Sequence, residues 1–154
     1  MLQKITPFLW FDHQALEAAE FYASIFKNSH IDDIGYYAEG NHQPAGKVMT
    51  VSFTLDGVHF TALNGGPEFH FTPAISFFVT CDSQEEIDYF WEKLGKNGEY
   101  VQCGWLTDRY GLSWQIVPSI LPKLLGNPDP EKAKRATQAM LQMTKLIIKD
   151  LEDA

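Results

Sequence analysis

The feature that most constrains the fold of this chain is a layout of elements that occurs twice. Residues 103–118 have the pattern of a tight hairpin, and an earlier hairpin with the same layout is indicated over 51–64. Each hairpin follows a strand-like run and an amphipathic helical pattern. We therefore expect one domain over 1–120, built from two strand–helix–strands units at about 3–66 and 72–118.

The first unit begins with a short apolar run over 5–11, and Asp12 is placed to cap the helix that follows. Apolar residues recur at three- and four-residue steps from Leu16 to Phe26, which predicts one buried helical face. A second strand is expected over 31–37. Asp56-Gly57 separates two alternating runs and is a strong signal for a two-residue hairpin turn.

The second unit repeats this order. A continuous apolar run over 74–79 predicts a strand, and residues 83–86 have the composition of a capping box at the start of the next helix. A short strand is expected over 100–102. The final hairpin is expected to turn near Tyr110-Gly111.

Residues 121–154 are expected to form a helical appendage after the second unit. Asp129-Pro130 has the composition of a helix start, with a capping acid and a proline at the first helical position. Apolar residues then step by three or four from Ala133 to Leu151, through Met140 and Met143. This pattern predicts one long C-terminal amphipathic helix, which needs a surface to cover.

The charge balance limits the partners of the chain. Its 154 residues carry a net charge of −8, with twenty acidic against twelve basic side chains. No cluster of Lys and Arg is visible, so we expect no nucleic acid partner, and the acidic balance favours a neutral or cationic small ligand. No apolar run has the length of a membrane span. The sequence enters a strand-like run directly after Lys4, so no signal peptide is expected, and two cysteines fit the cytoplasm.

Six segments of the chain match a known family in order. They are Leu9-Trp10-Phe11-Asp12, residues 21–26, Leu63-Asn64-Gly65-Gly66-Pro67, Cys103-Gly104-Trp105, residues 113–118 and residues 139–143. These segments resemble the PhnB-like branch of the vicinal oxygen chelate superfamily, which includes glyoxalase I, extradiol dioxygenases and bleomycin-resistance proteins. The resemblance implies an α+β fold whose tandem βαβββ units form a curved mixed β-sheet around a cavity, with the C-terminal amphipathic helix added. It also implies a homodimer.

The resemblance implies where a metal would lie. Metal-dependent members hold a divalent ion with His and Glu on inward strand positions, and the ion acts as a Lewis acid on a chelating substrate. The matching positions here are Thr6, one of Phe60, Ala62 or Asn64 depending on register, Ala74 or Ser76, and Gln115. None is a histidine or a carboxylate, so we expect no metal at the usual place. The alternative is a divalent-metal-dependent lyase, isomerase or dioxygenase.

A ligand pocket is expected on the inward strand faces. Gln115 is the best polar candidate, and it is either a ligand contact or a structural amide between strands. His59 and Asn64 also have structural interpretations. His59 is either a pocket residue or a half-exposed strand histidine, and Asn64 is either a pocket residue or a turn residue. The aromatic candidates either form the wall of the pocket or belong to the hydrophobic core. The full candidate set is Thr6, Phe8, Trp10, His59, Asn64, Ser76, Phe78, Trp105, Ser113 and Gln115.

The PhnB-like branch often carries the name 3-demethylubiquinone-9 3-methyltransferase. A methyltransferase of the common kind needs a Gly-rich loop between a strand and a helix, whereas Gly65-Gly66 leads into Pro67. We therefore expect no S-adenosylmethionine. Cys103 is interpreted as a small apolar residue rather than a nucleophile. Asp108-Arg109 is interpreted as a solvated pair or a strand-edge feature beside the turn.

Two functions remain open from the sequence. The first is a small-molecule-binding protein that works as a homodimer in the cytoplasm. The second is a metal-independent enzyme that uses the same cavity, with catalytic residues, substrate and reaction unassigned. The sequence excludes neither, because a polar residue on a strand face serves binding and catalysis equally well.

Overall fold

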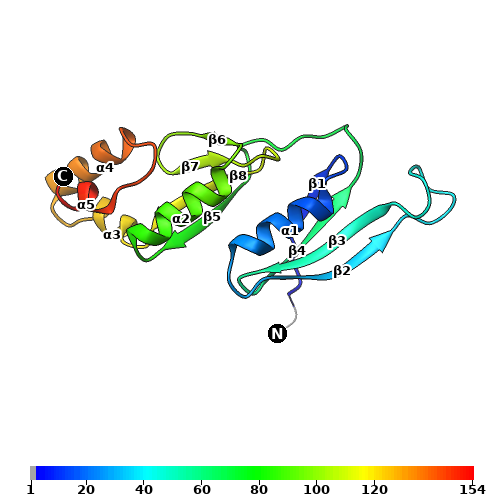
Figure 1. The fold of residues 1–154 in the computed structure, drawn as a ribbon. Helices are drawn as coiled ribbons and strands as arrows, with labels where there is room; N and C mark the ends of the chain where they lie inside the picture. The colour runs from blue at the N-terminus through cyan, green and yellow to red at the C-terminus, as the bar shows by residue number, and fades with distance from the viewer. Residues whose placement is uncertain (1–2) are drawn as a thin grey trace. The chain divides into compact units, whose positions relative to one another are not determined.

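The computed structural model describes residues 3–154, and the chain divides into two compact units, Met1–His70 and Phe71–Ala154. The elements of the first unit are β1 (Phe8–Phe11), α1 (Ala15–Ile25), β2 (His30–Tyr36), β3 (Val48–Leu55) and β4 (Val58–Asn64). The strands form a sheet in the order β1-β4-β3-β2, in which β1 pairs parallel to β4 and the other pairs are antiparallel. Helix α1 lies across one face of this sheet (Figure 1).

The second unit has the same architecture followed by three helices. Its elements are β5 (Ser76–Cys81), α2 (Gln84–Gly95), β6 (Glu99–Tyr100), β7 (Trp105–Thr107), β8 (Ser113–Pro118), α3 (Leu121–Leu125), α4 (Pro130–Leu141) and α5 (Ile148–Glu152). The sheet order β5-β8-β7-β6 repeats that of the first unit, again with the first strand parallel to the last. The predicted α+β fold of two βαβββ units with open, curved mixed sheets is confirmed.

Each unit buries one sheet face under its helix. In the first unit Tyr22 of α1 is fully buried and stacks on Phe53 of β3, which stacks in turn on Phe60 of β4. In the second unit Ile87 of α2 and Ile116 of β8 are fully buried. Burial of each such side chain stabilises the fold by about 1.5–3 kcal/mol. The opposite face of each sheet has no helix from its own βαβββ repeat across it.

The predicted turn at Asp56-Gly57 is confirmed. Both residues have positive φ, 47° and 80°, as a type I′ turn between antiparallel strands requires. The capping box at the start of α2 is also confirmed. Ser83 Oγ accepts from Glu86 N at 3.2 Å, while the Glu86 carboxylate accepts from Asp82 N, one residue before the cap.

The predicted cap of α1 by Asp12 is wrong. Helix α1 begins at Ala15, and its N-terminal flanking residue, Gln14, makes no side-chain cap. The reason is that pairing with the end of β4 continues past β1, since Gly66 N donates to Asp12 O at 3.3 Å. This bond ties residue 12 to the end of β4, and the helix starts later than the sequence pattern predicts.

The prediction of one long C-terminal helix is also wrong. The helix starts at Asp129-Pro130 as predicted, with Asp129 Oδ1 accepting from Glu131 N at 3.0 Å, but α4 ends at Leu141. The carbonyls of Met143 and Thr144 instead accept from Cys103 N and Gly104 N, each at 2.8 Å, and Leu146 is fully buried. These hydrogen bonds keep residues 143 and 144 from continuing helix α4, and the chain becomes helical again only at α5.

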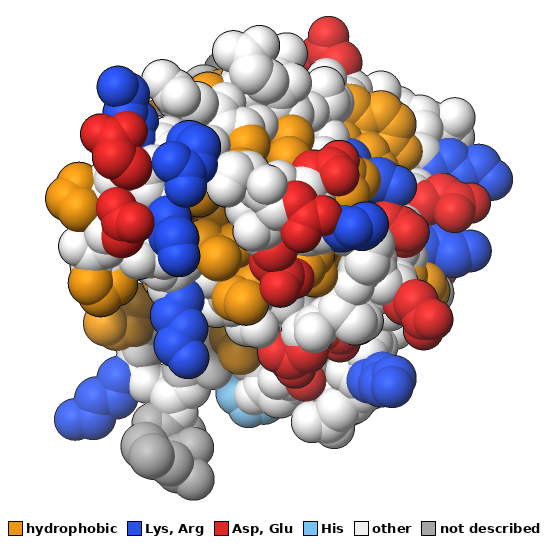
Figure 2. Space-filling view, turned by 90° about the vertical axis from the view of Figure 1, so that its left-hand side faces the viewer, with side chains coloured by type: hydrophobic (Ala, Val, Ile, Leu, Met, Phe, Trp, Pro, Cys, Tyr) orange, Lys and Arg blue, Asp and Glu red, His pale blue; other side chains and the backbone are white. Residues whose placement is uncertain are grey.

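The appendage covers part of its own unit. Val117, Leu121, Leu146 and Leu151 form a buried cluster against which the partly buried side chains of Met140 and Met143 pack, as well as Leu124, Leu125 and Ala139. On the face that carries these C-terminal helices, acidic and basic side chains are interspersed and do not gather by sign (Figure 2). No helix of residues 3–154 is long and apolar enough to cross a membrane.

Candidate functional site

The open face of the second sheet gathers five of the predicted site residues. Strand pairing places Phe78, Gln115 and Trp105 side by side across β5, β8 and β7. Ser76 and Ser113 form the next row in the same way. Because directly paired residues and residues two apart on a strand point to one face, all five side chains share the face opposite α2.

Gln115 occupies the middle of this face. Its Nε2 donates to Ser76 Oγ at 2.9 Å, so half of the amide is used between strands. Among residues 3–154, nothing donates a hydrogen bond to Gln115 Oε1. Phe78 on one side is 56% exposed, and Trp105 on the other is partly buried. Gln115 thus carries a free acceptor oxygen on the strand between two strands that each present an aromatic residue on this face.

The open face of the first sheet carries a second group of predicted residues. Phe8 and Trp10 of β1 lie on it, as does His59 of β4. Trp10 is fixed by its surroundings, since its Nε1 donates to Gly66 O at 2.9 Å and its ring packs edge-on against Phe69. A Cβ on Gly65 would fall 2.4 Å from the Trp10 ring, which explains a glycine at that position.

Thr6 precedes β1 and is exposed. It lines a pocket of about 360 Å³ together with His59. Thr6 and His59 are therefore brought together, and they share the first sheet's open face with Phe8 and Trp10.

Asn64 lies on the other face of the first sheet, beside α1. Its Oδ1 accepts from Ala15 N at 2.8 Å, and its Nδ2 donates to Val48 O at 3.2 Å. Asn64 therefore supplies the cap of α1 that Asp12 was expected to supply. It also borders a separate pocket of about 470 Å³ with Tyr37 and Lys47.

The donor chemistry at the family's metal positions does not fit a divalent transition metal. Phe60, Ala62 and Asn64 all face α1, and the first two are buried. Thr6, Ser76 and Gln115 offer neutral hydroxyl and amide oxygens, which are weak ligands for such ions. Within residues 3–154, no group of three or more His, Cys, Asp or Glu is arranged to hold a metal.

Asp108 is a buried structural residue, so the expectation of a solvated pair is wrong for it. Its side chain is only 2% exposed and accepts from Tyr110 N at 2.8 Å, Leu112 N at 3.1 Å and Trp114 Nε1 at 2.9 Å. The signal in the sequence was an Asp three residues before Gly111, the composition of a turn whose first side chain bonds the following backbone.

The Cys103-Gly104-Trp105 motif serves to hold the C-terminal segment. Cys103 and Gly104 both have positive φ, 61° and 83°. Their amides bind the carbonyls of residues 143 and 144, and a Cβ on Gly104 would fall 2.8 Å from Ile116 O. The other cysteine, Cys81, is fully buried, and burial raises the pKa of its thiol to about 12.

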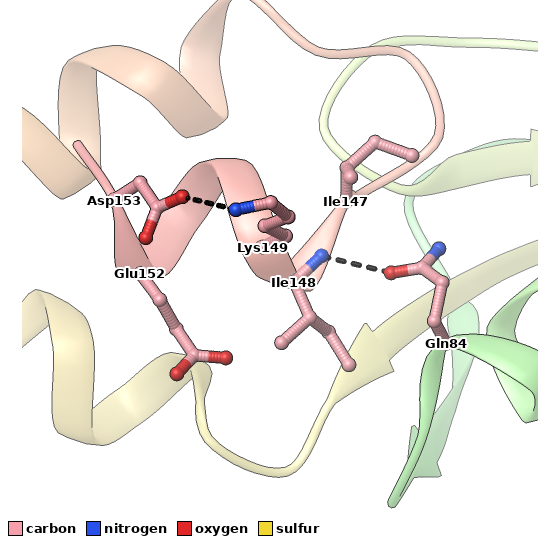
Figure 3. A pocket seen from close by; sticks show the side chains of 6 residues that line it. All are labelled: Gln84, Ile147, Ile148, Lys149, Glu152 and Asp153. Atoms are coloured by element: carbon pink, nitrogen blue, oxygen red, sulfur yellow. Dashed lines mark hydrogen bonds and ion pairs between the residues drawn. The ribbon is translucent and has the colours of Figure 1, made fainter.

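A pocket of about 330 Å³ lies between α2 and α5 (Figure 3). Gln84 Oε1 accepts from Ile148 N at 2.8 Å, and its Nε2 donates to Leu146 O at 3.1 Å. Lys149 Nζ is bonded to Asp153. Gln84 thus joins α2 to the backbone of the segment that leads into α5, so we assign the pocket to the attachment of the tail.

Comparison with known proteins places this fold. The tandem βαβββ units and their sheet order are the fold that the sequence resemblance implied. The model of the family described as 3-demethylubiquinone-9 3-methyltransferase matches residues 3–117, and the chain belongs to that family. The predicted resemblance is confirmed.

Two solved structures give the scale of the similarity. A PhnB protein from Bacillus cereus, described as a candidate 3-demethylubiquinone-9 3-methyltransferase, is 40% identical, with a TM-score of 0.69 over 76% of this chain and 100% of its own. A Pseudomonas aeruginosa protein is 20% identical, with a TM-score of 0.61 over 75% of this chain and 96% of its own, which shows the fold alone. None of the curated proteins matches the chain.

Proposed function

We propose that this protein binds a small molecule on the open face of its second sheet without a chelated metal. The observation that carries the proposal is the row Phe78–Gln115–Trp105, in which no group of residues 3–154 donates to the Gln115 amide oxygen and both neighbouring strands carry an aromatic residue. A buried or half-buried amide needs partners for all its polar atoms, and here a ligand can supply the missing donor.

The chemistry of this face defines the ligand class. A flat apolar or aromatic group would pack against Phe78 and Trp105. A hydroxyl or N–H group on the same ligand would donate to Gln115 Oε1. The net charge of −8 supports a neutral or cationic ligand over an anion.

We do not propose a metal or S-adenosylmethionine as a cofactor. The metal positions hold neutral donors or face α1. Strand β4 is followed by the segment 65–75 and then by β5, not by the helix that a strand-to-helix nucleotide loop requires. A metal-independent reaction on the same face is compatible with the proposal, and its chemistry would start from the bound ligand.

A matched pair of probes tests the site. Benzamide has an aromatic ring and an N–H donor, and N,N-dimethylbenzamide lacks the donor. In ¹⁵N-labelled protein we expect benzamide to shift the Gln115 side-chain amide and the Trp105 indole resonances saturably, and dimethylbenzamide to shift them far less. Gln115→Leu should abolish the benzamide response, whereas Gln138→Leu, an exposed position on α4, should retain it. Equal responses to both probes would contradict the proposal.

We also propose that the protein works as a homodimer in the cytoplasm. The family resemblance and the two free cysteines support this. The apolar stripe of the appendage does not, because Met140 and Met143 pack on their own unit. Light scattering should give about twice the chain mass of 17.5 kDa, and a stable species at 17.5 kDa would contradict the dimer.

A further inference from the structure

Four polar side chains form a hydrogen-bonded chain on the open face of the first sheet. His30 Nε2 and Asp32 Oδ1 are 2.8 Å apart, Thr54 Oγ1 donates to Asp32 Oδ2 at 2.7 Å, and Thr54 Oγ1 and His59 Nδ1 are 2.9 Å apart. Thr54 is only 3% exposed, whereas His59 is 56% exposed. The chain therefore joins two exposed imidazoles, His30 and His59, through a buried hydroxyl.

The proton count along this chain determines the tautomer of His59. An ionised carboxylate only accepts hydrogen bonds, so the single Thr54 hydroxyl proton is used on Asp32. Thr54 Oγ1 can then only accept from His59, which places a proton on His59 Nδ1. In the neutral imidazole the opposite nitrogen, Nε2, is left with its lone pair free.

The surroundings of His59 form a pocket of about 360 Å³, lined by Gln3, Thr6, Asp32, Ser52, His59, Phe60 and Thr61. Gln3 fixes its edge, because its Oε1 accepts from His59 N at 3.1 Å and its Nε2 donates to His59 O at 3.0 Å. Within residues 3–154, the hydroxyls of Thr6, Ser52 and Thr61 make no side-chain hydrogen bond. Among residues 3–154, no Lys or Arg lines the pocket.

We propose that this pocket is a second ligand-binding site, in which His59 Nε2 is the hydrogen-bond acceptor. It would take a small neutral or cationic molecule that presents a hydroxyl or an N–H group to Nε2. Thr54 and Asp32 are positioning residues, because they hold the imidazole in the Nδ1–H tautomer and orient its free nitrogen. An anion is disfavoured, since the Asp32 carboxylate lines the pocket. This site lies in the first unit and does not depend on the Gln115 face.

The first test needs no ligand. Long-range ¹H–¹⁵N correlation spectra of histidine-labelled protein at pH 8.5 report which imidazole nitrogen carries the proton. We expect His59 in the Nδ1–H tautomer, and the same in Thr54→Ser, which keeps the hydroxyl. Thr54→Val should lose this preference, whereas Thr50→Val, the same change on the same face of β3, should keep it. A wild-type His59 protonated on Nε2 would overturn the proposal.

The second test uses phenol and anisole, which differ by one donor. We expect phenol to shift His59 Nε2 saturably and anisole to leave it in place. Thr54→Val should weaken the affinity for phenol roughly three- to tenfold, which corresponds to the loss of about one hydrogen bond. Gln115→Leu should leave this affinity unchanged. Equal responses to phenol and anisole would contradict the site even if the tautomer is as expected.

Discussion

Some single residues in this protein have structural roles that the neighbouring sequence does not indicate. Asp108 stands next to Arg109 beside a turn, the usual setting of a solvated pair, yet its carboxylate is buried and accepts three hydrogen bonds. The turn before β8, and through it the placement of Gln115, depends on this one side chain.

Replacing Asp108 should therefore destabilise the fold. Asp108→Asn keeps the shape, but an amide has one acceptor oxygen and brings an NH₂ group against backbone donors. We expect a loss of about 2–3 kcal/mol in the free energy of unfolding, measured by urea denaturation. Asp33→Asn, on the exposed face of β2, is the control and should change stability by less than about 0.5 kcal/mol. A loss that small at Asp108 would contradict its assigned role.

Cys81 gives the fold a dependence on alkaline pH. Burial, with the nearby Glu86 and Asp82 charges adding to it, raises the pKa of its thiol from 9.0 to about 12. Between these values the unfolded chain loses the proton while the folded chain keeps it, so stability falls as pH rises from 9 towards 12. Below pH 9 the contribution is constant.

The Cys81 effect is isolated by comparing variants. The free energy of unfolding of the wild type should fall more steeply between about pH 8.5 and 10.5 than that of Cys81→Ala. The Cys103→Ala variant should follow the wild type. Parallel curves for wild type and Cys81→Ala would show that the Cys81 thiol is not protected in the folded state.

At the scale of elements, the order of strands and helices was predictable from sequence, whereas the side chains that join them were not. The Asp56-Gly57 turn and the Ser83 cap depend on neighbours in the chain, and both are where the pattern predicts. The cap of α1 comes from Asn64, 49 residues away from Ala15, which no local pattern reveals. Likewise, the amides of the Cys103 motif interrupt a helix that periodicity alone would continue.

The candidate site follows the same division. Alternation along β8 correctly placed Ser113 and Gln115 on one face, and register then aligned them with β5 and β7. The strand register also places Asn64 on the face of the first sheet that packs against α1, which the sequence alone does not determine. The contacts of His59 with Asp32 and Thr54 cross three strands, so the sequence predicted the histidine but not its partners.

The cap by Asn64 joins β4 to α1 and should be worth more than a surface hydrogen bond. Asn64→Ala removes both the bond to Ala15 N and the bond to Val48 O. We expect a loss of about 1–3 kcal/mol in the free energy of unfolding. Asn41→Ala, in the exposed loop before β3, should be nearly neutral. Equal effects of the two changes in thermal denaturation would contradict the cap.

The attachment of the tail depends on Gln84 (Figure 3). Gln84→Ala leaves Ile148 N without its acceptor, so hydrogen exchange of the Ile148 amide should become roughly tenfold faster or more. Glu85→Ala, an exposed change on the same helix turn, should leave this amide protected. Unchanged exchange in Gln84→Ala would mean that the apolar cluster around Leu146 holds α5 without this bond.

At the scale of the whole molecule, the strand positions that the family resemblance assigns to a metal hold neutral side chains in this chain. Thr6, Ser76 and Gln115 suit hydrogen bonding, and aromatic residues flank the Gln115 amide. The fold therefore gives the open sheet faces, and the residues on them decide the chemistry. We propose that recognition takes place at Gln115 and needs no metal.

The most direct test of metal-free recognition at Gln115 is a calorimetric titration of benzamide into dialysed protein with excess EDTA. We predict saturable binding that persists in EDTA and is lost in Gln115→Leu but not in Gln138→Leu. Binding that disappears in EDTA and returns with a divalent ion, or that survives Gln115→Leu, would contradict this assignment.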